Sequence, residues 1–130
     1  MSPIISSRKQ VFEKESEILI GICLEIHKLL GAGFSEIVYK DALEFELTER
    51  NIKFEREKKY CIRYKTTVLP HYFFADFIVY GNFIIELKSK SEITKDDLAQ
   101  TINYLKCSGC KVALIINFGA AQLGVKRVVL

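Results

Sequence analysis

The sequence has no tryptophan, so nine phenylalanines and six tyrosines must supply the bulk of its core. It also lacks an apolar run long enough to cross a membrane, and its N-terminus lacks the apolar centre of a signal peptide. Its excess of charge is small: a net +3 permits nucleic-acid binding but does not require it. We therefore expect a cytoplasmic protein without a membrane segment, which folds as a single domain with a sizeable core.

Cysteine is sparse as well, and the four cysteines of a cytoplasmic chain are expected to be reduced. Cys107 and Cys110 have the C-x-x-C spacing of a redox or zinc site. A redox pair usually begins at a helix N-terminus, whereas Cys107 follows a helical pattern. A structural zinc site needs four ligands, and no second pair has suitable spacing. We interpret the pair as part of a helix-to-strand turn and keep a redox or zinc module as a third alternative.

The first half of the chain has the patterns of two helices. Residues 1–10 are polar and are expected to form a flexible N-terminal arm, and residues 11–130 a single domain. Apolar residues recur with helical spacing over 13–30, and Ser35 is a suitable N-cap for a second helix that ends near Arg50. The apolar positions expected for this second helix are Val38, Ala42 and Phe45, flanked by Leu43 and Leu47.

The second half alternates between strand and helix patterns. Residues 53–64 predict one or two strands, Pro70 interrupts, and apolar strands follow over 73–80 and 83–88. Thr94 and Asp97 resemble a capping box that opens a helix ending near Gly109. Strands are expected over 112–116 and 125–130. The order ααβββαββ predicts an α/β fold, a mixed sheet with helices packed on it.

Three ionisable residues interrupt the two apolar strands: Asp76 in the first, and Glu86 and Lys88 in the second. A buried charge is unfavourable unless it is paired, neutralised or bound to a metal. Glu86 and Lys88 are two residues apart and therefore project from the same face of a strand. One reading is a buried ion pair that only balances charge. The other is a site for metal-dependent cleavage of a phosphodiester.

Phosphodiester cleavage needs an activated water and neutralisation of the developing charge, which Mg²⁺ held by carboxylates can supply. Asp76 and Glu86 would hold the ion, with the Leu87 backbone carbonyl as a further ligand, and Lys88 would assist the attacking water or the transition state. This site has a geometric condition. A two-residue loop at Gly81-Asn82 would point Asp76 away from Glu86, whereas a three-residue loop or a bulge would bring both to one face.

The spaced motif Asp76…Glu86-Leu87-Lys88 resembles the core motif of the PD-(D/E)XK nuclease superfamily, with Ala75 in place of the proline. The segment from Gly33 to Tyr39 (Gly-Phe-Ser-Glu-Ile-Val-Tyr) resembles the signature of the small bacterial GxxExxY family within it. The similarity extends from the first helix to the final strand. It implies a restriction-endonuclease-like fold, a central mixed β-sheet flanked by α-helices, and Mg²⁺-dependent cleavage of nucleic acid, with Mn²⁺ as a substitute.

The resemblance also implies supporting residues. Glu36 matches a glutamate that related nucleases carry beside the metal, where it could be a further ligand. Gln100 and Tyr104 match a Gln-x-x-x-Tyr motif on the helix after the lysine strand, and their i,i+4 spacing puts them on one helix face.

For the partner, we expect nucleic acid, in the first place DNA, with Lys90, Lys95 and Arg63 as candidate phosphate contacts. A homodimer is an option, since small nucleases often use two subunits on a duplex. The alternative function is a non-cleaving nucleic-acid-binding or regulatory module that keeps the nuclease fold.

Overall fold

The computed structural model of the chain describes residues 3–130, with side chains from Phe12 onwards. Its elements, in order, are α1 (Pro3–Leu30), α2 (Glu36–Glu49), β1 (Phe54–Tyr64), β2 (Thr67–Val79), β3 (Phe83–Lys88), α3 (Lys95–Ser108), β4 (Val112–Asn117) and β5 (Gly124–Val129). The predicted order ααβββαββ is confirmed. Helix α1 begins before the expected start near residue 13. The flexibility expected of residues 1–10 stays a prediction, and residues 1–2 lie outside the described part.

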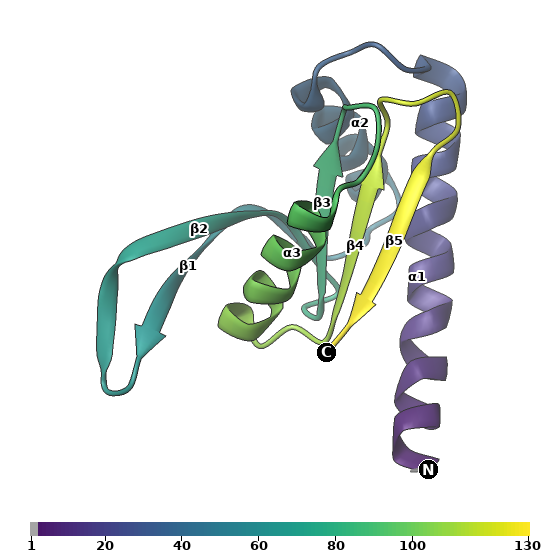
Figure 1. Cartoon of the computed structure of the whole chain (residues 1–130). Helices are drawn as coiled ribbons and strands as arrows, with labels where there is room; N and C mark the ends of the chain where they lie inside the picture. The colour runs from purple at the N-terminus through teal and green to yellow at the C-terminus, as the bar shows by residue number, and fades with distance from the viewer. Residues whose placement is uncertain (1–2) are drawn as a thin grey trace.

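The five strands form one mixed sheet in the order β1-β2-β3-β4-β5. Only β3 and β4 are parallel, and α3 is the crossover that connects them. Figure 1 shows the β1–β2 hairpin projecting away from the rest of the molecule. We call its outer part, residues 58–75, the arm. None of the helices within residues 3–130 has both the length and the apolar character that a membrane span needs.

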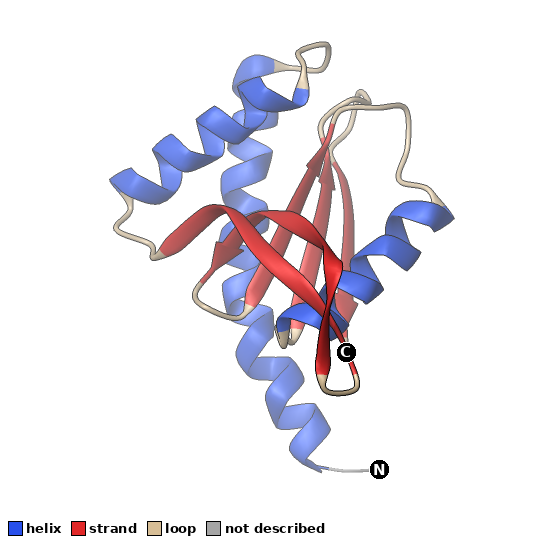
Figure 2. Cartoon of the chain, turned by 90° about the vertical axis from the view of Figure 1, so that its left-hand side faces the viewer, coloured by secondary structure: helices blue, strands red, loops and turns tan. Residues whose placement is uncertain are grey.

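Helices cover both faces of the sheet, and the side chains of each strand alternate between these two faces. On one face, α1 and α2 pack on Phe83, Ile85 and Leu87 of β3. On the other, Leu105 of α3 packs with Ile84. Because side chains alternate along a strand, the charged residues of β3 after Ile85 point to the α3 face. Figure 2 shows this arrangement from the side, with the arm crossing in front of α3.

The buried stripe of α2 differs from the prediction. Tyr39, Leu43 and Leu47 are buried, whereas Phe45 is 61% exposed. The expectation for Phe45 was therefore wrong, whereas Val38 and Ala42 are half-buried and the flanking Leu43 and Leu47 are fully buried. The reason is tertiary: the ring of Tyr39 stacks on Phe118, with 4.4 Å between centroids, and this contact turns the helix toward the neighbouring stripe.

Strand β2 runs through Pro70, which the sequence suggested as an interruption. The register of β1 with β2 shifts between Cys61 and Arg63, opposite the segment that contains Pro70. Proline has no N–H to donate to a ladder, so pairing is disturbed there without ending the strand.

The loop between β2 and β3 meets the condition set by the sequence. Val79 pairs with Phe83 and Phe77 with Ile85, which leaves the three residues 80–82 in the loop. Tyr80 and Gly81 both have positive φ, 56° and 76°. A three-residue connection is thus confirmed, and Asp76 and Glu86 are the next opposed residues beyond the paired segment.

A tight contact fixes the chain that leaves β3. The Asn117 side chain donates to the Lys90 carbonyl (2.8 Å) and accepts from its N–H (3.0 Å). The Phe118 N–H donates to the Lys88 carbonyl (2.8 Å). A Cβ added at Gly119 would lie 2.2 Å from the Lys90 backbone nitrogen, so only glycine fits. This contact holds the segment after Lys88 against the end of β4.

We predict that Gly119→Ala lowers the free energy of unfolding by about 2–3 kcal/mol, since the added methyl group must displace backbone. Gly21→Ala is the matched control. Its added Cβ meets nothing within 4 Å on α1, so it should stabilise the protein by roughly 0.5–1 kcal/mol. Urea unfolding of both variants measures the difference. Equal effects would contradict the close approach at Gly119.

Candidate active site

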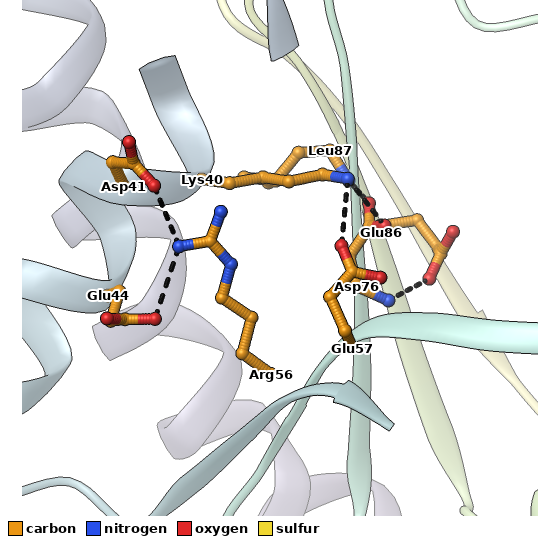
Figure 3. Close-up of polar contacts among 8 residues, drawn as sticks. All are labelled: Lys40, Asp41, Glu44, Arg56, Glu57, Asp76, Glu86 and Leu87. Carbon is orange, nitrogen blue, oxygen red and sulfur yellow. Dashed lines mark hydrogen bonds and ion pairs between the residues drawn. The ribbon is translucent and has the colours of Figure 1, made fainter. Parts of the chain in front are cut away.

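Where β2 separates from β3, two carboxylates accept hydrogen bonds from backbone N–H groups in place of the ladder between the strands. The last backbone pair is Phe77 with Ile85. Beyond it, the Asp76 N–H donates to Glu86 Oε2 (2.9 Å), and the Leu87 N–H donates to Asp76 Oδ2 (2.8 Å), as Figure 3 shows. Each carboxylate thus satisfies a backbone donor that the diverging strands would leave unpaired. The exchange fixes both side chains next to each other in a buried position.

This arrangement perturbs the acidity of Glu86. Burial, and then the charge of Asp76, raise the pKa of the Glu86 carboxyl from 4.5 to about 8. The hydrogen bond from the Asp76 backbone and the charges of Lys88 and Lys40 oppose this rise without cancelling it. Two adjacent carboxylates that cannot both ionise readily are typical of sites that bind a cation or share a proton.

The side chain of Lys40 reaches the site from α2. Its Nζ lies 3.1 Å from Asp76 Oδ1 and 3.3 Å from Glu57 Oε1 (Figure 3). Burial works to lower the pKa of Lys40, but its contacts with Asp76 and Glu57 outweigh burial and raise it. The backbone of Glu57 has a positive φ of 53°, which is unusual for glutamate and for a residue inside a strand.

Salt bridges tie β1 to α2 beside this cluster. Arg56 Nη1 lies 2.8 Å from Asp41 Oδ1 and 3.2 Å from Glu44 Oε1 (Figure 3). These contacts hold α2, and with it Lys40, at the root of the β1–β2 hairpin.

Lys88 points to the α3 face, as predicted from its spacing to Glu86. Its Nζ lies 3.9 Å from Asp97 Oδ1, and Lys90 Nζ lies 2.6 Å from Asp97 Oδ2. Asp97 is held by the capping box: Thr94 Oγ1 accepts from the Asp97 N–H, and Asp97 Oδ2 accepts from the Thr94 N–H. Burial favours a higher pKa of Asp97, but the bonds from Lys90 and Thr94 prevail and lower it. The predicted capping box is confirmed, and it also anchors both lysines.

Tyr104 lies near the carboxylates, whereas Gln100 and Glu36 are exposed. Burial, then the charges of Glu86 and Asp76, raise the pKa of Tyr104. Its ring stacks on Phe73 at 3.9 Å, with 2° between the planes. Gln100 lies one turn earlier on α3 and Glu36 one turn before Lys40 on α2. Neither makes a side-chain hydrogen bond or ion pair with another described residue.

The candidate phosphate contacts lie apart from one another. Lys90 follows β3 and pairs with Asp97, Lys95 is the exposed first residue of α3, and Arg63 is exposed near the tip of the arm. Lys90 therefore lies beside the site through Asp97, whereas neither Lys95 nor Arg63 makes a side-chain hydrogen bond or ion pair with another described residue.

The cysteines do not form a centre of their own. All four are free thiols, with Cys107 exposed and Cys110 buried at the end of α3. Within the described residues, no three His, Cys, Asp or Glu side chains gather as a metal cluster. Neither observation supports the redox or zinc alternative.

Sequence patterns missed Lys40, Glu57 and Asp97 as members of this site. Lys40 and Glu57 look like ordinary surface charges on amphipathic elements, and Asp97 was interpreted only as a cap. One signal existed for Lys40: it follows Glu36 by four residues, and such a pair shares a helix face.

In a comparison with protein families, the sequence model of the PD-(D/E)XK nuclease superfamily matches residues 13–128. No curated protein and no solved structure matches the chain. The chain therefore belongs to the PD-(D/E)XK nuclease superfamily, and its three helices and five-stranded mixed sheet form a restriction-endonuclease-like α/β fold. Membership indicates a nuclease, hence a phosphodiesterase with a nucleic-acid substrate, and a divalent metal as the general cofactor of the superfamily.

The raised pKa of Glu86 predicts how metal-free stability depends on pH. The folded chain keeps this carboxyl protonated up to about pH 8, whereas the unfolded chain ionises it near 4.5. Between these values the folded state binds more protons, so the free energy of unfolding must fall as pH rises. Urea unfolding in EDTA from pH 5 to 8.5 measures the slope, and Glu86→Gln should reduce it. Parallel curves for the two proteins would refute the assignment.

Proposed function

We propose that this protein is a Mg²⁺-dependent nuclease that hydrolyses phosphodiester bonds, with DNA as the first candidate substrate. The observation that carries the proposal is the exchange of hydrogen bonds that fixes Asp76 beside Glu86. Family membership supports the reaction class. The cytoplasmic location and a homodimer stay predictions.

The donor set fits a divalent ion. Mg²⁺ in enzymes is commonly bound through one or two carboxylates and otherwise through water and substrate phosphate. Asp76 and Glu86 would hold the ion, whose charge would offset the burial and the repulsion by Asp76 that raise the pKa of Glu86. The Leu87 N–H points to Asp76, and since both polar groups of a strand residue point the same way, its carbonyl is a suitable further ligand. Mn²⁺ should substitute.

A bound Mg²⁺ lowers the pKa of a coordinated water and neutralises charge on the phosphate. Lys88 projects on the same side as Glu86, where its ammonium group orients the attacking water or stabilises the transition state. Asp97 keeps Lys88 and Lys90 close to the α3 end of the site. Lys40 occupies Asp76 Oδ1 and would move toward Glu57, its second partner at 3.3 Å, when Asp76 takes a metal.

Three further residues have supporting roles in this proposal. Glu36 shares a helix face with Lys40 and can serve as a ligand from the α2 side. Gln100 and Tyr104 on α3 can contact the phosphate or a metal-bound water. Lys90, Lys95 and Arg63 are the proposed phosphate contacts away from the cleaved bond.

We further propose that the chain is a member of the bacterial GxxExxY family, and its motif has a structural rationale. Gly33 has a φ of 113°, which favours glycine. The Tyr39 hydroxyl donates to the Gly31 carbonyl at 2.5 Å and accepts from the Phe34 N–H at 3.3 Å. The glycine and the tyrosine thus fix the start of α2, which carries Glu36 and Lys40.

The cleavage test compares wild type with Lys88→Ala and Glu86→Gln on labelled DNA and RNA, with Mg²⁺, with Mn²⁺ and in EDTA. Loss of a charge-stabilising group should reduce kcat by about 10²–10³-fold. Lys126→Ala, an exposed lysine two strands away on β5, is the control and should cleave normally. Wild-type protein that binds nucleic acid but turns over none of these substrates would favour the non-cleaving module instead.

Metal binding can be tested without turnover. Saturating Mg²⁺, at about 100 times its Kd, should stabilise wild type by about 2.7 kcal/mol and raise Tm by several degrees. Asp76→Asn and Glu86→Gln should lose this shift. Asp41→Asn, which removes a carboxylate paired with Arg56 on the exposed side of α2, should retain it. A Tm that does not respond to Mg²⁺ or Mn²⁺ in wild type would rule out the proposed ligands.

A further inference from the structure

The arm concentrates the positive charge of the chain. Residues 58–75 contain no aspartate or glutamate, and their cations are Lys58, Lys59, Arg63 and Lys65. The whole chain carries a net charge of only +3. A two-stranded projection with four cations and no anion is complementary to a polyanion, and not to a basic partner.

The two faces of the arm differ in what covers them. On one face, Phe73 stacks on Tyr104 of α3 and on Tyr60, the latter at 5.4 Å between centroids. The Phe73–Tyr104 stack ties this face of the arm to α3. On the other face, Tyr72 and Phe74 remain 56% and 47% exposed. These two aromatic rings are therefore not needed for the core.

The exposed rings combine stacking surface with charge. Tyr72 and Phe74 contact each other edge to face, with 5.5 Å between centroids and 83° between planes. Lys59 pairs with Phe74 across the ladder, and its Nζ lies 4.3 Å from the centre of the Tyr72 ring. Aromatic faces interleaved with cations bind nucleic acid whose bases are unstacked. In a duplex these base faces are already covered.

This surface is continuous with the candidate active site. Phe74 precedes Asp76 by two residues in β2, a distance of about 7 Å along a strand. Lys59 follows Glu57 by two residues in β1, and Glu57 shares Lys40 with Asp76. A single strand of nucleic acid bound along Tyr72 and Phe74 would therefore lead to the two carboxylates.

We propose that the exposed face of the arm, formed by Lys59, Tyr72 and Phe74, binds single-stranded nucleic acid and guides it to Asp76 and Glu86. Bases stack on the two rings, and Lys59 and Arg63 contact phosphates. The guiding step rests on the proposed nuclease function, whereas the binding step does not.

Fluorescence anisotropy in EDTA tests binding apart from cleavage, with labelled oligo-dT, oligo-U and a DNA duplex of equal length. Wild type should bind the single strands more tightly than the duplex. The double variant Tyr72→Ala/Phe74→Ala should bind them roughly 10- to 100-fold more weakly, because stacking contributes to affinity at each base. Lys59→Gln should flatten the slope of log K against log salt by about 0.7.

Two controls separate stacking from folding. Tyr72→Phe keeps the ring and should bind as wild type does. Phe45→Ala removes an equally exposed ring on α2 and should also leave binding unchanged. Both aromatic positions on the arm are exposed, so thermal unfolding should show folded variants. Unchanged single-strand affinity in the double variant, or tighter binding of the duplex by wild type, would overturn the inference.

The outcome also separates this inference from the proposed function. Metal-dependent cleavage of duplex DNA without single-strand binding would leave the nuclease proposal standing and remove the role of the arm. Ring-dependent binding of single strands without any cleavage would support the arm and remove the nuclease proposal.

Discussion

The structure around the candidate site depends on the hydrogen bonds that Asp76 and Glu86 exchange across the opening between β2 and β3. Beyond Phe77 the two strands diverge, and backbone N–H groups would remain unpaired in a buried position. The carboxylates of the two strands accept those N–H groups. The hydrogen bonds at the point where β2 separates from β3 therefore also hold the two acidic side chains together.

The positive charges that balance this acidic pair come from different elements of the fold. Lys40 approaches from α2, while Lys88 lies on β3 and is held by Asp97 of α3. Each lysine has a second carboxylate partner or neighbour, so neither depends on Asp76 or Glu86 alone. In the proposed function, a divalent ion would take the place of Lys40 at Asp76, and Lys40 would keep Glu57 as its partner.

Much of this organisation could be predicted from the sequence. The order of elements and the capping box at Thr94 follow from local patterns, and both are confirmed. The loop length before Phe83 was left open by the sequence, and the structure has the three-residue loop that a shared site requires. The centre of the buried face of α2 was not predicted: Phe45 is exposed, and Tyr39, which stacks on Phe118, is buried beside Leu43 and Leu47. Such a choice depends on a residue 79 positions away, which no local pattern contains.

The sequence by itself determined the type and order of the elements and the identity of the charged residues in the apolar strands, since periodicity and turn chemistry act between near neighbours. Only the tertiary structure decided which electrostatic partners those charged residues have. Lys40 contacts both Asp76 and Glu57, and Asp97 lies beside Lys88, because α2, β1 and α3 converge at the point where β2 leaves β3. Electrostatic partners are selected by distance in space: Lys40 contacts Asp76 across 36 positions of the chain, and no local pattern contains that pair.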